Sequence, residues 1–201
     1  MKKPIKSSVW LALLLAVIYG IFSFVPYIFS NPGCGERARN TLLEIKEGFD
    51  TDTLNWNKDI PTEDWDGVTI NSDGCVTNLF LVDEYLKGVI SPEIGNLTSL
   101  RYLTLSGNQL TGIIPPELGN LSNLTLLSLH NSQITGPIPP ELGKLTNLTT
   151  LFLHNSQLTG TIPPSLGNLT NLTTLALFNN QLTGTVPSEV RNLPNLIHSR
   201  F

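Results

Sequence analysis

The chain contains 201 residues, of which 14% are charged, and its net charge at pH 7 is −4. This balance argues against nucleic acid as a partner, because phosphates are bound mainly through clustered lysine and arginine. The sequence also lacks a recognisable pair of catalytic carboxylates, a serine placed with a base, and a glycine-rich phosphate loop. We therefore expect a protein that is not an enzyme and that uses no cofactor.

The first predicted element is a nearly uncharged run at residues 9–29, which follows Lys2, Lys3 and Lys6. As a helix, this run spans roughly 30 Å, which matches the hydrocarbon thickness of a bilayer. The lysines favour a cytoplasmic amino terminus. We therefore predict a cytoplasmic tail at residues 1–8, a transmembrane signal-anchor at 9–29 and a hinge at 30–35, with the remainder on the extracytoplasmic side. A cleaved signal peptide is the alternative, and it predicts a secreted protein.

Residues 36–72 are predicted to form an N-terminal cap. Ala38, Leu42 and Ile45 recur at helical spacing, which predicts an amphipathic helix over residues 36–49. Trp56 and Trp65 follow this helix. We expect both indole rings to pack over the first of the repeats that come next.

A 24-residue unit then repeats without insertion or deletion over residues 97–120, 121–144, 145–168 and 169–192, and a more divergent copy occupies residues 73–96. A fixed period of this length predicts a solenoid, because one unit cannot bury its apolar face alone and stacked units can. Each unit begins with a half-buried strand. It ends with prolines, which favour a short 3₁₀ or extended segment on the outer face. The organisation predicted for residues 73–192 is therefore five stacked repeats.

The repeated pattern is L-x-x-L-x-x-L-x-L-x-x-(N/S)-x-(L/I)-x-G-x-(I/V)-P. It resembles the leucine-rich repeat family, and its L-T-G-x-I-P form is similar to the plant-specific subclass. The resemblance implies an α/β repeat solenoid, a right-handed superhelix with a parallel sheet on its concave face, where ligands of the family usually bind. The family also bonds backbone groups between rungs through a buried asparagine ladder. Ser132 and Ser156 occupy this position here, so we expect a weaker ladder in the middle two rungs.

The two cysteines leave two possibilities open. Cys34 and Cys75 either form one disulfide, which would close a loop of about 40 residues and stabilise the fold by roughly 4 kcal/mol, or they remain free thiols. The plant pattern also places cysteines beside the second tryptophan of the cap, where this chain has Glu63 and Ile70.

Residues 193–201 begin another unit but hold Ser199 where a leucine is expected. Three interpretations stay open: a truncated gene model, a minimal C-terminal cap, or a strand edge that pairs with another chain.

The strand residues that point away from the core form columns, one residue per repeat and about 4.8 Å apart. The columns are mostly small and polar but include several rings. The candidate ligand-binding residues on this concave face are Phe80, Val82, Tyr102, Thr104, Ser128, His130, Phe152, His154 and Phe178. The predicted hot spot is formed by the two histidines with Phe152 and Phe178, because aromatic side chains contribute disproportionately to binding. The alternative is that these are ordinary solvent-facing strand residues.

Hydroxyl, amide and aromatic groups suit a protein, peptide or carbohydrate ligand better than a phosphate. His130 and His154 lie one rung apart, which suggests a shared metal ion. No third ligand occupies a neighbouring outward position, so we predict no metal site. The two imidazoles instead form a candidate weak pH sensor, because neighbouring imidazoles resist double protonation.

Six N-x-(S/T) sequons are candidate N-glycosylation sites in a eukaryotic secretory pathway. They begin at Asn96, Asn120, Asn123, Asn147, Asn168 and Asn171. The repeat itself spells G-N-L-T-N-L-T, which explains the sequons equally well without modification. Glycans at these positions would cover the flank before the strands and leave the concave face free.

These observations favour a membrane-anchored, receptor-like recognition module without catalytic activity, whose signal passes through a signalling partner or co-receptor. A first alternative is a secreted or cell-wall-associated protein, similar to the polygalacturonase inhibitors that share the repeat subclass. A second is an ice-binding structural protein. It is suggested by an array of equally spaced threonines at Thr111, Thr135, Thr159 and Thr183.

Overall fold

The computed structural model describes residues 33–201. The predicted tail, the signal-anchor and the hinge up to residue 32 lie outside the described residues, so the membrane anchor remains a prediction. Between residues 33 and 201, no helix combines the length and the apolar character that crossing a membrane requires.

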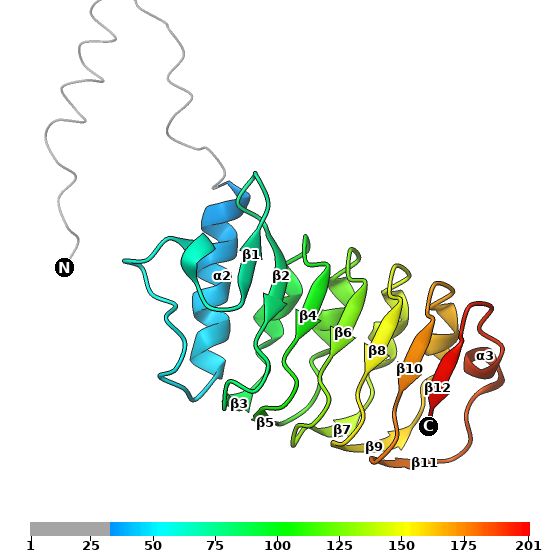
Figure 1. Ribbon diagram of the computed structural model, residues 1–201. Helices are drawn as coiled ribbons and strands as arrows, with labels where there is room; N and C mark the ends of the chain where they lie inside the picture. Colours follow the sequence, from blue (N-terminus) through cyan, green and yellow to red (C-terminus); the bar gives the residue numbers. More distant parts are fainter. Residues whose placement is uncertain (1–32) are drawn as a thin grey trace, which may run out of the picture. The chain divides into compact units, whose positions relative to one another are not determined.

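The repeats stack into a solenoid whose concave face is a seven-stranded sheet (Figure 1). Its strands, in spatial order, are β1 (Val68–Ile70), β2 (Val76–Phe80), β4 (Tyr102–Thr104), β6 (Leu126–Ser128), β8 (Thr150–Phe152), β10 (Thr174–Ala176) and β12 (His198–Arg200). Strand β1 runs antiparallel to β2, and all later neighbours are parallel. The register advances by one repeat at each step, so Leu103 lies opposite Leu127 and Leu127 opposite Leu151. The predicted solenoid with a parallel sheet is confirmed.

Short elements that follow the predicted prolines form the outer side. The 3₁₀ helices are η2 (Pro92–Asn96), η3 (Pro116–Asn120), η4 (Pro140–Lys144) and η5 (Pro164–Asn168), and the last repeat has the α-helix α3 (Ser188–Arg191). Strands β3 (Lys87–Val89) and β5 (Gln109–Thr111) pair with each other, and β7 (Thr135–Pro137), β9 (Gln157–Thr161) and β11 (Gln181–Thr183) form a second small sheet. A proline begins each of these four 3₁₀ helices. Proline is tolerated there because the first N–H of a helix has no hydrogen-bond partner within the helix. The predicted 3₁₀ segments on the outer face are confirmed.

The core is a continuous stack of aliphatic side chains between the main sheet and the outer elements. Leu103, Leu127 and Leu151 are fully buried at equivalent positions. The rungs approach closely enough to require glycine: a Cβ on Gly119 would lie 2.5 Å from the carbonyl oxygen of Glu141. Each rung therefore fits the next with little free space, and substitutions at this interface have nowhere to relax.

The cap begins with helix α2 (Cys34–Gly48), close to the predicted 36–49, which buries Ala38, Leu42 and Ile45. The 3₁₀ helix η1 (Thr62–Asp64) and strand β1 complete it. The rings of Trp56 and Trp65 are buried and stacked, with centroids 5.7 Å apart. As predicted from the sequence, both tryptophans belong to the apolar core that continues into the first repeat.

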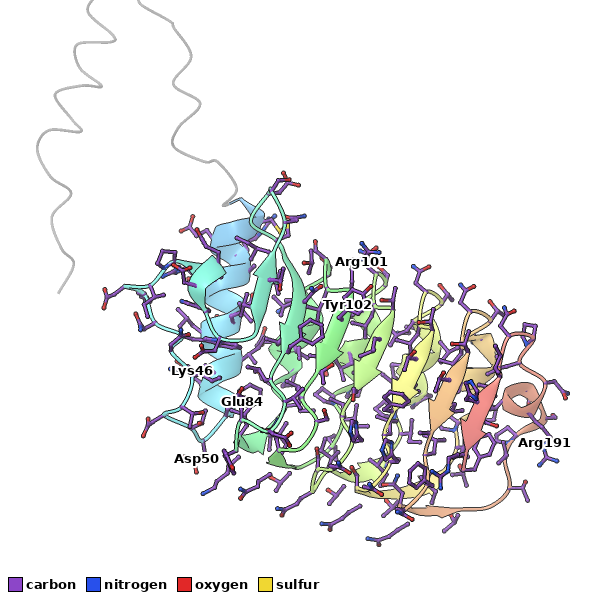
Figure 2. All side chains as sticks on the ribbon, viewed as in Figure 1. Lys46, Asp50, Glu84, Arg101, Tyr102 and Arg191 are labelled. Atoms are coloured by element: carbon purple, nitrogen blue, oxygen red, sulfur yellow. A yellow bond between two sulfur atoms is a disulfide. The ribbon has the colours of Figure 1, made fainter. Side chains whose placement is uncertain are left out.

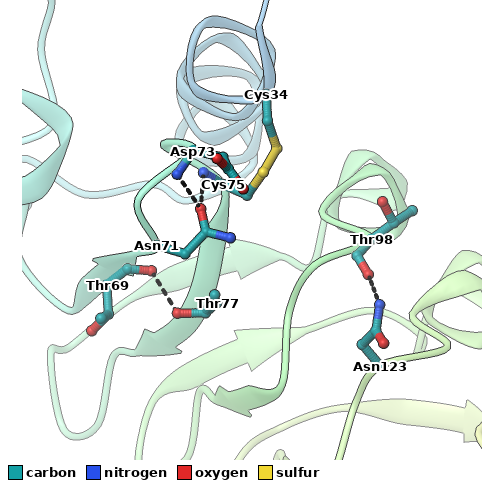
Figure 3. The surroundings of a disulfide bond; sticks show 8 residues. All are labelled: Cys34, Thr69, Asn71, Asp73, Cys75, Thr77, Thr98 and Asn123. Atoms are coloured by element: carbon teal, nitrogen blue, oxygen red, sulfur yellow. Dashed lines mark hydrogen bonds between the residues drawn. A yellow bond between two sulfur atoms is a disulfide. The ribbon is translucent and has the colours of Figure 1, made fainter.

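A disulfide joins Cys34 to Cys75 across a Cα–Cα distance of 5.1 Å (Figure 3). It connects the first residue of α2 to the residue before β2. The side-chain oxygen of Asn71 accepts the backbone N–H groups of Asp73 and Cys75 and so fixes the intervening turn. Of the two alternatives left open by the sequence, the bridge is therefore the one that forms.

The buried asparagine ladder is strong at its ends and weak in the middle, as expected. The amide of Asn108 donates to two carbonyl groups at 2.7 and 2.9 Å, and its oxygen accepts two backbone N–H groups. Asn180 donates to two carbonyl groups at 2.9 and 2.8 Å and accepts one N–H. The hydroxyl of Ser132 makes one such bond. The buried hydroxyl of Ser156 makes none within residues 33–201.

Residues 193–201 continue the solenoid by one strand. Strand β12 pairs in parallel with β10, and Leu193 is buried beneath it. This places the side chain of Arg200 on the concave face, beside residues of the preceding rung.

Candidate functional site

The concave face carries a line of stacked planar side chains that we call the aromatic track. Its members are His130, Phe152, His154, Phe178 and Arg200. The rings of His130 and His154 are nearly parallel, with centroids 4.4 Å apart and an interplanar angle of 11°. The rings of His154 and Phe178 follow at 4.6 Å and 16°. The Arg200 guanidinium closes the line 4.1 Å above the Phe178 ring.

The repeat period produces this stack. Positions 130, 154 and 178 are equivalent in successive rungs, and parallel strands place equivalent side chains about 4.8 Å apart. That distance suits offset stacking of planar rings. Phe152 projects from the neighbouring column and meets both histidines edge to face, at interplanar angles of 87° and 83°. The track is thus a pre-ordered surface of rings rather than a set of independent side chains.

Burial keeps the two imidazoles neutral. It lowers the pKa of His130, and the nearby Asp83 carboxylate offsets only part of that effect. Burial likewise lowers the pKa of His154, and the charges of His130 and Arg200 lower it further. The Nδ1 atom of His154 is buried and has no hydrogen-bond partner within residues 33–201. Both rings therefore offer an uncharged surface at neutral pH.

Ser128 differs from its prediction. We expected it to face a ligand, but it is only 3% exposed, and its hydroxyl lies 2.8 Å from Nδ1 of His130. Ser106 and Ala176, which share the outward columns, are also buried. Ser128 and Ala176 both lie opposite Phe152 in the register of the sheet. Ser128 is therefore a support for the His130 ring and not a contact surface.

A second apolar group, the N-terminal patch, lies at the other end of the sheet. It consists of Phe80, Val82 and Tyr102, all exposed. The rings of Phe80 and Tyr102 stack with centroids 6.2 Å apart, and Figure 2 shows Tyr102 on the open side of β4. Tyr85, which the sequence did not single out, is 74% exposed, but it lies in the turn between β2 and β3 and not on the sheet. Its backbone φ is 57°, which is unusual for a tyrosine and which the repeat pattern does not predict.

Between the aromatic track and the N-terminal patch, the face is small and polar. Thr104 is partly exposed, and it was predicted as a contact residue. Beside the track, Asn131, Asn155 and Asn179 share a left-handed backbone, with φ between 53° and 54°. Their side chains bond to one another, from Asn155 to Asn131 and from Asn179 to Asn155, each at 2.7 Å. This exposed amide ladder fixes the edge of the track.

The ring nitrogens of the two stacked histidines do not point toward a common metal position. Near-parallel rings direct their nitrogen lone pairs side by side rather than toward one ion. Within residues 33–201, no group of three or more His, Cys, Asp or Glu side chains is placed to hold a metal.

Three of the four equally spaced threonines bond to the backbone of the preceding rung. The hydroxyls of Thr111, Thr135 and Thr183 donate to glycine carbonyl groups of the preceding rung at 3.0, 3.1 and 3.3 Å. Three of the four threonines in the array therefore use their hydroxyl hydrogens to bond one rung to the next.

Comparison with known proteins agrees with this architecture. A family model described as leucine-rich repeat region matches residues 79–198. Receptor-like protein 36 of Arabidopsis thaliana is 40% identical over 73 residues, which is 36% of this chain and 10% of that protein. The chain spans about a tenth of the length of the curated relatives that it matches.

Several solved structures superpose on most of the chain. The BIR2 ectodomain from Arabidopsis thaliana has a TM-score of 0.70 and 34% identity, covering 76% of this chain and 84% of that one. The ectodomain of the plant receptor kinase GASSHO1/SCHENGEN3 from Arabidopsis thaliana, in complex with CASPARIAN STRIP INTEGRITY FACTOR 2, has a TM-score of 0.73 and 39% identity over 80% of this chain and 20% of that one. A plant ice-binding protein has a TM-score of 0.59 and 30% identity over 80% of this chain and 61% of that one.

Proposed function

Because this chain belongs to the leucine-rich repeat family, we propose that it is a receptor-like recognition module that binds a peptide or protein segment along its concave sheet. The observation that carries the proposal is the aromatic track. Its rings are held in place by stacking and by a buried serine before any ligand arrives. A pre-ordered surface loses little side-chain entropy on binding, which favours affinity.

The chemistry of the face supports a peptide over a phosphate ligand. The imidazoles are neutral, and Arg200 is the cation stacked on the track. Rings and amides suit apolar side chains and backbone groups, as in other interface hot spots. The aromatic track and the N-terminal patch lie at opposite ends of the face, so an extended segment that crosses the strands would contact both.

The proposal includes the predicted placement of the chain. A signal-anchor at residues 9–29 would hold the repeats on the extracytoplasmic side, and a co-receptor would transmit the binding event. The similarity to receptor ectodomains and the presence of a disulfide support an extracytoplasmic location. The alternative, a secreted inhibitor-like protein, predicts a mature amino terminus near residue 30, whereas an anchor predicts that residues 9–29 are retained.

Ice binding remains the second alternative, supported by the similarity to a plant ice-binding protein. The engaged threonine hydroxyls weaken it, because their hydrogens are not available to water. An assay of ice recrystallisation separates the two functions, since a recognition module has no effect on crystal growth.

Selection from a displayed peptide library tests the proposal directly. The parent protein is the bait in every round, and each enriched peptide is then measured against a Phe152→Ala/His154→Ala variant. A Glu117→Ala/Lys144→Ala variant, changed at exposed positions on the outer helices, is the control. We expect enriched peptides to bind the parent and the control but not the concave-face variant. Enrichment of peptides that bind all three equally would oppose the proposal.

A further inference from the structure

The six sequons fall into two groups by their place in the repeat. Building on the proposed extracytoplasmic location, we propose that Asn120 and Asn168 accept N-linked glycans, whereas Asn123, Asn147 and Asn171 are structural and stay unmodified. Asn120 and Asn168 are the last residues of the outer helices η3 and η5. The other three lie in the turns that lead into strands β6, β8 and β10.

The turn asparagines form a ladder that ties each rung to the one before. The side-chain amide of Asn123 donates to the Thr98 carbonyl at 2.9 Å (Figure 3). Asn147 and Asn171 repeat this bond in the next two rungs, both at 2.8 Å. Asn195 makes the same bond at 2.8 Å, although the residues after it do not complete a sequon. The bond alone therefore explains asparagine at this position.

The threonines that complete these turn sequons are engaged in the same way. The hydroxyl of Thr125 donates to the Arg101 carbonyl at 2.9 Å. Thr149 and Thr173 donate to carbonyl groups of the preceding rung, both at 3.0 Å. In the turn sequons, the side-chain nitrogen and the hydroxyl are both committed to inter-rung bonds.

The helix-end sequons show the opposite arrangement. Asn120 and Asn168 are exposed, and within residues 33–201 neither side chain makes a hydrogen bond; the same holds for the hydroxyl residues that complete their sequons. Asn96 shares their position, but its amide donates to the Glu93 carboxylate at 2.6 Å and it lines a groove beside α2. We therefore restrict the proposal to Asn120 and Asn168.

The chemistry of the modification makes this difference matter. The amide nitrogen attacks C1 of a lipid-pyrophosphate-linked oligosaccharide, the N–C bond forms as the C–O bond breaks, and the lipid pyrophosphate leaves while the nitrogen gives up one proton. The product is a bulky, solvated sugar on the protein surface. At Asn147 the nitrogen loses one of its two hydrogens beside the neighbouring turn, whereas at Asn168 no bond is lost. Glycans would thus cover the outer helix ends and leave the turns and the concave face open.

Asn147 and Asn168 form a matched pair, because each is followed by Leu-Thr. An added cleavable signal directs the full chain into the secretory pathway of insect cells. The protein is collected from the membranes and the medium, and glycopeptides are mapped by mass spectrometry. We expect most molecules to carry glycan at Asn120 and Asn168 and few to carry it at Asn147. Occupancy at Asn147 equal to that at Asn168, or no glycan at Asn168, would overturn the proposal. Because the added signal ensures entry into the secretory pathway, this test does not depend on residues 9–29 acting as a signal-anchor. The same mapping on the chain without the added signal tests the anchor.

A second measurement tests the structural role without any glycan. In protein made in bacteria, Asn147→Ala removes one inter-rung bond and should lower the melting temperature by about 2–4 °C. Asn168→Ala removes none and should leave it unchanged. Equal melting temperatures for the two variants would contradict the assignment of Asn147 to the ladder.

Discussion

Replacing Ser156 with asparagine should stabilise the solenoid, because it fills the gap in the buried ladder. The Ser156 hydroxyl has no partner within residues 33–201. Asn180 occupies the equivalent position one rung later and donates to the Leu153 and Leu177 carbonyl groups. By the repeat, an asparagine at 156 faces the equivalent carbonyl groups of Leu129 and Leu153.

The backbone at this position already suits asparagine. The preceding residues in the two rungs, Asn155 and Asn179, have the same φ of 53°. Two new bonds are worth about 0.5–1.5 kcal/mol each, and fixing the longer side chain costs about 1 kcal/mol. The net gain is therefore about 0–2 kcal/mol, and the loss of the unpaired buried hydroxyl acts in the same direction.

Urea unfolding monitored by tryptophan fluorescence and by circular dichroism measures this gain. The cap contains Trp56 and Trp65, and the repeats supply the circular dichroism signal, so the two signals report whether the solenoid unfolds as one unit. The reverse change, Asn180→Ser, is the matched control and should destabilise by a similar amount. An unfolding midpoint for Ser156→Asn at or below that of the parent, with Asn180→Ser destabilising as expected, would refute the ladder argument.

Three further predictions follow from the structure. Replacing both cysteines of the cap disulfide with serine should lower the free energy of unfolding by about 4 kcal/mol, the loop-entropy value for a loop of this length, and the loss should be measurable in urea. Gly143→Ala should be strongly destabilising, since its Cβ would lie 2.4 Å from a backbone oxygen of the next rung, whereas Gly33→Ala meets no atom within 4 Å; melting temperatures would show equal effects if this packing argument were wrong. Because the folded-state pKa values of His130 and His154 are lowered, the unfolded chain binds more protons as the pH falls below about 6.5. Stability should therefore be complete above that pH and decline below it, and this decline should be smaller in His154→Phe; an identical decline in parent and variant would exclude the stack as its cause.

The repeat made much of the fold predictable from sequence. Sheet order, register and outer 3₁₀ segments follow from local patterns that recur unchanged, so an inference about one rung held for the others. The weak middle of the asparagine ladder was also foreseen, because it depends on which residue occupies one position, as at Ser132 and Ser156. The boundaries of the cap helix differed from the prediction by only one or two residues, because the helix follows from the local spacing of its apolar residues.

Features that depend on several rungs at once were not predictable. The bond between Cys34 and Cys75 requires the packing of α2 against the start of β2, which spacing does not supply. Ser128 lies between Thr104 and Phe152 in the register of the sheet, and its burial cannot be deduced from strand alternation alone. Arg200 lies opposite Ala176 in the register of the sheet, and its guanidinium reaches the Phe178 ring of the neighbouring column. Each of these outcomes is set by side-chain packing between rungs.

The dissociation constant of a selected peptide for the parent and for two variants tests the central claim most directly. Removing the rings of Phe152 and His154 together should weaken binding by at least about tenfold, since hot-spot side chains are typically worth 2 kcal/mol or more. Removing the outer side chains of Glu117 and Lys144 should leave the constant unchanged. Equal dissociation constants for the parent and the concave-face variant would contradict the assignment of recognition to the aromatic track.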